Sequence, residues 1–145
     1  MICFDSSYLV RLYYQDAGAE AVRALAATDH VACAAHGQAE MMAAFHRKLR
    51  EGAIRPAAYA ALMGQVLAHI EAGAFQWLAQ HSEIFLRIRH VYQKLPAVVF
   101  LAADAIHLAT AAESGFRIVY SNDAHLLGAA KYFGIEGRDV IGKAI

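Results

Sequence analysis

Four acidic side chains stand at positions from which they can share a metal ion. Asp5 directly follows a short apolar run that is typical of a strand, and Asp123 comes just after a second such run. Glu40 lies about one turn inside a helix that follows a third strand, and Asp104 starts another helix. In open α/β sheets, ligand sites form at the carboxyl ends of the strands. Asp5 and Asp123 belong at that edge directly, Glu40 reaches it from the adjoining helix, and Asp104 joins them if its helix starts there.

Each of these acids has an ordinary explanation when it is taken alone, because Asp often caps helices and Glu often lies on a solvated helix face. Asp104 and Glu40, however, have mostly apolar sequence neighbours, and a buried carboxylate is costly unless it is paired or metal-bound. If the four acids converge, their repulsion raises some of their pKa values, and a divalent cation removes that conflict. Carboxylate ligands without cysteine or paired histidine favour Mg²⁺ or Mn²⁺ over zinc. This pattern predicts metal-assisted phosphodiester hydrolysis.

The elements that must position these acids alternate between strand and helix along the chain. Hydrophobic periodicity and helix end signals predict strands at residues 2–4, 30–34, 75–78, 117–121 and 138–141, and helices at residues 7–14, 17–27, 38–51, 56–71, 82–95, 104–115 and 123–134. Such alternation predicts an α/β fold around a small, mostly parallel sheet of four to five strands. We expect one domain over residues 1–145.

Composition narrows the class of protein further. The chain has 145 residues, of which 59% are hydrophobic and 18% charged, so a disordered chain is excluded. Thirteen Lys and Arg balance thirteen Asp and Glu, so binding to nucleic acid must come from local basic patches. Two cysteines exclude a disulfide scaffold, and we expect Cys3 and Cys33 to be reduced core thiols. No apolar run approaches the roughly 20 residues of a membrane span, and we expect a cytoplasmic protein.

Five segments in order carry a resemblance to a known family: residues 4–10 (Phe-Asp-Ser-Ser-Tyr-Leu-Val), 39–40 (Ala-Glu), 103–111 (Ala-Asp-Ala-Ile-His-Leu-Ala-Thr-Ala), 121–126 (Ser-Asn-Asp-Ala-His-Leu) and 129–135 (Ala-Ala-Lys-Tyr-Phe-Gly-Ile). Together they resemble the PIN-domain nucleases, and more closely the VapC toxins of bacterial toxin–antitoxin pairs. The chain departs from the family at the end of the second strand, where relatives often have Ser or Thr and this chain has Cys33-Ala34-Ala35-His36.

The resemblance implies a PIN-like three-layer α/β/α fold and a Mg²⁺- or Mn²⁺-dependent endoribonuclease. It implies that the metal is held by Asp5, Glu40, Asp104 and Asp123, and that Ser6 and Asn122 help to order the metal-bound water or the phosphate. It also implies a homodimer and a small VapB-like antitoxin that masks the site.

Basic residues close to these acids are candidates for contacts with RNA phosphates. Arg47, Lys48 and Arg50 follow Glu40 on the same predicted helix, and Arg87, Arg89 and Lys94 form a second cluster. For each cluster, a solvated helix face is an equally good interpretation. His107 falls on the same helix face as Asp104, where it fits either an outer partner of the acids or a packed or capped histidine, and we favour the second interpretation.

Three other functions fit parts of the sequence. A PIN-fold module that binds RNA or protein without catalysis is the main alternative. A haloacid-type phosphatase requires Asp-x-Asp after the first strand, whereas the third position here is Ser7. A receiver domain requires adjoining acids before its first strand and a Lys late in the sheet, and neither is clear.

Overall fold

The computed structural model describes residues 1–142, in which strands and helices alternate as the sequence predicts. In chain order the elements are β1 (Ile2–Phe4), α1 (Ser6–Tyr13), α2 (Ala19–Ala26), β2 (Val31–Ala34), α3 (Gly37–Arg50), α4 (Pro56–Glu71), β3 (Phe75–Leu78), α5 (Ser82–Gln93), α6 (Ala102–Glu113), β4 (Ile118–Tyr120), α7 (Ala124–Ala129), the 3₁₀ helix η1 (Ala130–Phe133) and β5 (Glu136–Arg138).

The five strands form one sheet in the order β3-β2-β1-β4-β5, and every neighbouring pair is parallel. The sequence predicts a mostly parallel sheet of four to five strands. The structure confirms this prediction with five strands, all of them parallel. The chain builds outward from β1 through β2 to β3 and then crosses to the other side of β1. The strand order therefore reverses between β1 and β4, and ligands of open α/β sheets bind at the carboxyl ends of such strands.

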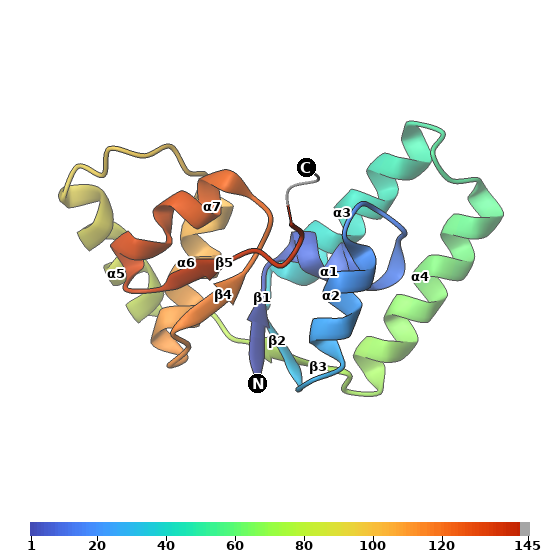
Figure 1. Cartoon of the computed structure of the whole chain (residues 1–145), viewed down its shortest axis with the longest axis horizontal. Helices are drawn as coiled ribbons and strands as arrows, with labels where there is room; N and C mark the ends of the chain where they lie inside the picture. The colour runs from blue at the N-terminus through green and yellow to red at the C-terminus, as the bar shows by residue number, and fades with distance from the viewer. Residues whose placement is uncertain (143–145) are drawn as a thin grey trace.

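Helices cover both faces of the sheet (Figure 1), which gives the three-layer α/β/α arrangement. Side chains alternate between the two faces of a strand, so Phe4 of β1 packs in the core beneath α1 to α4, whereas Cys3 packs in the core beneath α5 to α7. Cys3 and Cys33 are buried free thiols, as predicted. Among residues 1–142, no helix is long and apolar enough to cross a membrane.

The α3–α4 pair extends outward from the sheet (Figure 1), and this explains one error in the predicted core. The sequence periodicity of residues 56–71 predicts buried side chains at five positions along the helix. In α4 only Val66 is fully buried, while Tyr59, Leu62, Met63 and Ile70 are partly exposed. A helix that packs along one side only cannot bury a full apolar stripe.

Several element boundaries differ from those predicted. The helix predicted to begin at Asp104 begins at Ala102, which places Asp104 in its first turn. The residue type of Ser82 predicts an N-cap, but Ser82 is the first residue of α5, and that helix ends at Gln93 rather than at residue 95. The helix predicted to reach residue 134 changes to a 3₁₀ turn after Ala129.

The last predicted strand, residues 138–141, is wrong in position. Strand β5 is Glu136–Arg138, and the chain after it crosses over α1 instead of continuing the sheet. There the hydroxyl of the buried Tyr8 donates to Asp139 Oδ1 at 2.7 Å and accepts from the Val140 amide at 2.7 Å. These bonds fasten the end of the described chain to the helix that begins at Asp5.

Candidate metal centre

Asp5 ends β1 and caps α1, and its carboxylate is buried at the junction of the two elements. One oxygen, Oδ1, accepts from Ser7 Oγ at 2.6 Å and from the Tyr8 amide at 3.2 Å, while Oδ2 accepts from Ser121 Oγ at 2.6 Å. Burial raises the pKa of Asp5 above its ordinary value, although these hydrogen bonds and the charge of His107 act in the opposite direction. The structure therefore holds a desolvated carboxylate in a fixed orientation.

Ser121 connects Asp5 to Asp123 across the edge of the sheet. Its fully buried hydroxyl donates to Asp5 and accepts from the Asp123 amide at 2.9 Å. Asp123 is the N-cap of α7, where its Oδ1 accepts from the amides of His125 at 2.7 Å and Leu126 at 3.2 Å. Within residues 1–142, all hydrogen bonds to this carboxylate are made to Oδ1, so Oδ2 is left available to a ligand.

Asp104 reaches the same edge from the first turn of α6. Its carboxylate is buried and accepts from the backbone amide of Leu101 at 2.7 Å. Burial raises the pKa of Asp104, and the negative charges of Asp123 and Glu40 raise it further. The condition stated for Asp104 from the sequence is met, because its helix begins at the edge where the other acids lie.

Glu40, in the first turn of α3, is held by a histidine from another helix. His107 Nε2 of α6 donates to Glu40 Oε2 at 2.5 Å, and His36 Nε2 lies 3.6 Å from the same oxygen. Burial opposes ionisation of Glu40, but the hydrogen bond and charge of His107, with a smaller contribution from His36, outweigh it and lower the pKa of Glu40. His107 is buried, as the packed interpretation predicts, and it is also a hydrogen-bond partner of an acid, as the other interpretation predicts.

The partly buried His36 ends the loop after β2, where it is the N-cap of α3. Desolvation lowers the pKa of His36 to about 4, and the neighbouring His107 adds to this effect. The two imidazole rings lie with their centroids 4.0 Å apart. The structure therefore places two histidines beside Glu40 at the edge of the acidic site.

A cleft of about 550 Å³ opens beside the acids. The residues that line it are Ser6, Ser7, Val10, Arg11, Asp16, Glu40, Ala43, Ala44, Arg47, Lys48 and Asp123. Two predicted metal ligands, Glu40 and Asp123, thus face a cavity that also contains three basic side chains. Asp5 and Asp104 lie buried beyond this lining.

The three residues of the first predicted basic cluster, on α3, lie in different surroundings in the structure. Arg47 is exposed and lines the cleft, whereas Arg50 lies outside the lining. Lys48 also lines the cleft, but its ammonium lies 3.2 Å from Asp16 Oδ2 and 3.9 Å from the centre of the Tyr14 ring. In the second predicted cluster, Arg87 pairs with Glu113 at 2.5 Å.

The two predicted auxiliary polar residues occupy different settings. Ser6 lines the cleft beside Glu40. The side-chain oxygen of Asn122 accepts from Arg11 Nη1 at 3.2 Å, and Arg11 also donates to the carbonyls of Ser7 at 2.9 Å and Ala17 at 2.9 Å. Arg11 therefore joins α1 to the loop that carries Asp123.

Sequence reasoning missed Arg11, Ser121 and the Glu40–His107 contact. Arg11 lies one helical turn after Ser7, so a period of 3.6 residues would have placed it on the face of α1 that carries the serine. Ser121 directly precedes Asn122, at the strand end that the acids already marked. No sequence signal pairs Glu40 with a histidine 67 positions away.

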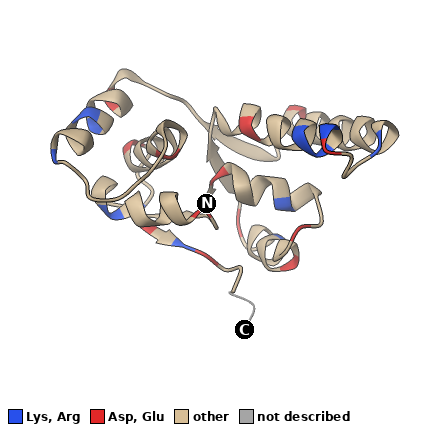
Figure 2. Ribbon diagram, turned by 90° about the horizontal axis from the view of Figure 1, so that it is seen from above, with Lys and Arg blue, Asp and Glu red and all other residues tan. Residues whose placement is uncertain are grey.

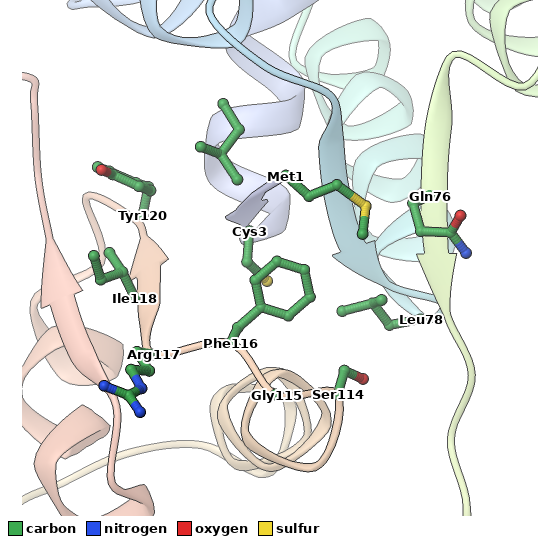
Figure 3. Close-up of a pocket in the computed structure, with 11 residues that line it drawn as sticks. Met1, Cys3, Gln76, Leu78, Ser114, Gly115, Phe116, Arg117, Ile118 and Tyr120 are labelled. Atoms are coloured by element: carbon green, nitrogen blue, oxygen red, sulfur yellow. The ribbon is translucent and has the colours of Figure 1, made fainter.

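A second cavity, of about 580 Å³, lies against the sheet near the beginnings of β1 and β4 (Figure 3). Its lining includes Met1, Cys3, Leu78, Phe116 and Arg117, and no acidic residue is among the described side chains that line it. The cavity is therefore separate from the acids at the carboxyl ends of the strands.

A family profile and two solved structures are similar to this chain. The family profile described as PIN domain matches residues 2–132. The crystal structure of FitAcB from Neisseria gonorrhoeae superposes with a TM-score of 0.75 at 17% identity and covers 94% of this chain and 96% of that chain. VapC20 from Mycobacterium tuberculosis, described as a sarcin–ricin-loop-cleaving toxin, gives a TM-score of 0.65 at 18% identity and covers 94% of this chain and 99% of that chain. The comparison with curated proteins gave no match.

Proposed function

The chain belongs to the PIN-domain family, and on that premise we propose that it is an endoribonuclease that uses Mg²⁺ or Mn²⁺ held by Asp5, Glu40, Asp104 and Asp123. One observation carries this proposal: two of these carboxylates are buried at the edge of the sheet where its strand order reverses. Within residues 1–142, neither Asp5, Asp104 nor Asp123 forms an ion pair with a basic side chain.

The donor set fits a hard divalent cation. Mg²⁺ and Mn²⁺ prefer carboxylate and water oxygens, and a buried carboxylate without a counter-charge is unfavourable in the absence of a cation. Burial raises the pKa of Asp5 and of Asp104, which is the direction expected where desolvation disfavours the charged form. A bound cation supplies the missing charge.

In the proposed reaction, a bound divalent ion supplies an activated water and stabilises negative charge on the phosphate. The chain supplies orientation. Three hydrogen-bond donors fix Asp5, His107 fixes Glu40, and the amides at the start of α7 fix Asp123. The exposed guanidinium of Arg47 lines the same cleft and is placed to contact RNA phosphates, for which arginine is well suited.

We further propose that the protein is the VapC-type toxin of a toxin–antitoxin pair, that it forms a homodimer, and that a VapB-like antitoxin covers its site in the cytoplasm. The likeness to VapC20 and to FitAcB supports the toxin fold. Apolar side chains that a partner can cover are exposed around the segment between α5 and α6, among them Leu95, Val99 and Leu101. Light scattering of the purified chain, alone and after co-expression with a VapB-like antitoxin, tests both assemblies.

The activity is tested with tag-free protein, freed of any bound partner, on total cellular RNA and on a sarcin–ricin-loop hairpin. We expect discrete fragments with Mg²⁺ or Mn²⁺, and none with EDTA or with the variants Asp5→Asn and Asp123→Asn. The matched control is Asp29→Asn, because Asp29 is an exposed aspartate bonded to the terminal amine, and it should cleave like the wild type.

Cleavage that survives chelation, or that survives in Asp5→Asn, would contradict the proposal. A wild-type protein that binds RNA and cuts none of these substrates with either metal would instead support the PIN-fold binding module without catalysis.

A further inference from the structure

Two histidines lie next to the acidic site, and the proposed reaction uses neither of them as a metal ligand. His36 comes from the loop after β2 and His107 from the second turn of α6, so two distant segments bring them together around Glu40. One ligand atom from each of His36, Glu40 and His107 can be chosen so that all three lie within 4.8 Å of one another. These residue types match a known class of metal ligand set, two histidines and one carboxylate.

We propose that His36, Glu40 and His107 form a second cation site, for a borderline divalent transition ion such as Zn²⁺ or Co²⁺, that shares Glu40 with the carboxylate site. This site is additional to the proposed nuclease activity. Metal can bind to it whether or not the protein cleaves RNA. Mg²⁺ does not fit it, because imidazole nitrogen is a poor ligand for that ion.

Two of the ligand separations can be compared with those of a shared ion: the first already fits, and the second requires the ligands to move apart. Zinc lies about 2.0–2.1 Å from imidazole nitrogen and about 2.0–2.2 Å from carboxylate oxygen, so two of its ligands lie at most roughly 4.3 Å apart. The separation of 3.6 Å between His36 Nε2 and Glu40 Oε2 already falls within that limit. The contact of 2.5 Å between His107 Nε2 and Glu40 Oε2 is a hydrogen bond, and it is shorter than the roughly 3.3 Å between two ligands of a tetrahedral zinc ion. Binding of an ion to both atoms therefore moves them apart and releases the shared proton to solvent.

His36 is also prepared for this role by its neighbours. Its Nε2 is buried and has no hydrogen-bond partner among residues 1–142. The amide nitrogen of Gln80 lies 2.9 Å from the other ring nitrogen, Nδ1, so in this orientation Nδ1 accepts and Nε2 carries the proton. A histidine that binds metal through Nε2 donates its Nδ1–H to an acceptor, and a half-turn of the Gln80 amide presents its carbonyl oxygen as that acceptor.

The position of this site explains why the sequence did not reveal it. His36 and Glu40 stand four residues apart, as on one face of a helix, but the third ligand lies 67 residues beyond Glu40. In the sequence, no second histidine lies at short spacing from His36 in a pattern typical of zinc ligands, so the sequence alone favours Mg²⁺ or Mn²⁺ over zinc. The fold supplies that histidine from α6.

The test measures metal binding to tag-free protein in the absence of RNA. Zn²⁺ is titrated by calorimetry, and Co²⁺ is followed by its visible ligand-field absorption, both in the presence of millimolar Mg²⁺. We expect one Zn²⁺ per chain that Mg²⁺ does not displace, and a Co²⁺ spectrum with nitrogen ligation. His36→Asn should weaken Zn²⁺ binding by more than about 100-fold, since loss of an outer partner alone costs roughly 10–100-fold.

Two variants separate this site from its surroundings. His46→Asn is the matched control, because His46 is an exposed histidine on the same helix, and it should bind Zn²⁺ like the wild type. Asp123→Asn removes a ligand of the carboxylate site alone and should keep the Zn²⁺ site while losing Mn²⁺ binding. Since His107 is buried and its replacement can disturb folding, the conclusion rests on His36→Asn, whose fold is checked by circular dichroism.

Equal Zn²⁺ affinity in wild type and a folded His36→Asn protein would overturn the proposal, as would complete displacement of Zn²⁺ by Mg²⁺. Neither result depends on the nuclease assay. Conversely, a chain that cuts no RNA but loses Zn²⁺ in His36→Asn would disprove the proposed function and keep this site.

Discussion

At the scale of single residues, Asp5 is the clearest case of chemistry that opposes stability. Its carboxylate is buried, and its pKa is raised, so ionisation costs more in the folded chain than in the unfolded one. Above the ordinary pKa of about 3.9, the unfolded chain has already released this proton while the folded chain still holds it. The free energy of unfolding therefore falls as pH rises from about 4 through the raised pKa of Asp5.

Asp5→Asn removes this contribution to the pH dependence. We expect the variant to gain stability relative to the wild type as pH rises over that window, by roughly 1.4 kcal/mol for each unit by which the pKa is raised. Urea unfolding in EDTA between pH 4 and 7 measures the difference. Asp29→Asn is the control, because Asp29 is exposed and its pKa is lowered by the terminal amine, so it should gain no stability with pH. Parallel curves for Asp5→Asn and wild type would contradict the assignment.

Ser121 carries a second prediction at this scale. Its hydroxyl is fully buried, donates to Asp5 and accepts from the Asp123 amide, so Ser121→Ala leaves two buried polar groups without that partner. We expect a loss of about 1–3 kcal/mol in the free energy of unfolding and slower RNA cleavage, because both acids lose a positioning contact. Ser114→Ala, at an exposed serine, should change stability by less than about 0.5 kcal/mol. Similar behaviour of the two variants would show that Ser121 does not hold the site.

At the scale of elements, the junction of β2 and α3 sets the position of Glu40. A Cβ atom added to Gly37 would lie 2.5 Å from the sulfur of Cys33, and Cys33 is fully buried in β2. The first turn of α3, which contains Glu40, therefore packs directly on the strand. Glycine is required here for this close approach.

Gly37→Ala should cost about 1–3 kcal/mol, since overpacking forces a shift of helix or strand. Cys33→Ala removes the clashing sulfur, so the cost of Gly37→Ala should be much smaller in that background. A double-mutant cycle from urea unfolding measures this coupling. Gly64→Ala is the control, because Gly64 lies in α4 with open space around it, and this change should stabilise by up to about 1 kcal/mol. Additive effects of the Gly37 and Cys33 changes would refute the contact.

The same elements show what the sequence can predict and what it cannot. Helix α4 was predicted with its observed ends, since Pro56 and Gly73, which lies just beyond the C-cap Ala72, give strong local signals. The start of α6 was misplaced because its N-cap is Leu101, which has no side-chain acceptor, and Asp104 reaches back to the Leu101 amide instead. The four acids could be found from strand ends and helix starts. The contact between Glu40 and His107 could not, since it joins two helices that cover opposite faces of the sheet and lies between residues 67 positions apart.

At the scale of the whole molecule, charge is balanced in number and scattered in space. Lys and Arg lie on both helical layers (Figure 2), and their total equals that of Asp and Glu. Long-range attraction to RNA is therefore weak, and binding depends on the few cations beside the site. Of the two basic clusters in the sequence, the one on α3 places Arg47 in the cleft with Glu40, whereas Arg89 of α5 is exposed elsewhere.

This difference predicts which cluster binds phosphate. Each neutralised phosphate of single-stranded RNA contributes about −0.7 to the slope of log K against log salt concentration. In an Asp5→Asn background that prevents cleavage, Arg47→Ala should weaken RNA binding and make the slope shallower by about 0.7, as measured by fluorescence anisotropy over a salt series. Arg89→Ala should leave both affinity and slope unchanged. If Arg89→Ala makes the slope shallower and Arg47→Ala does not, RNA binds to the α5 side of the molecule and not in the cleft beside the acids.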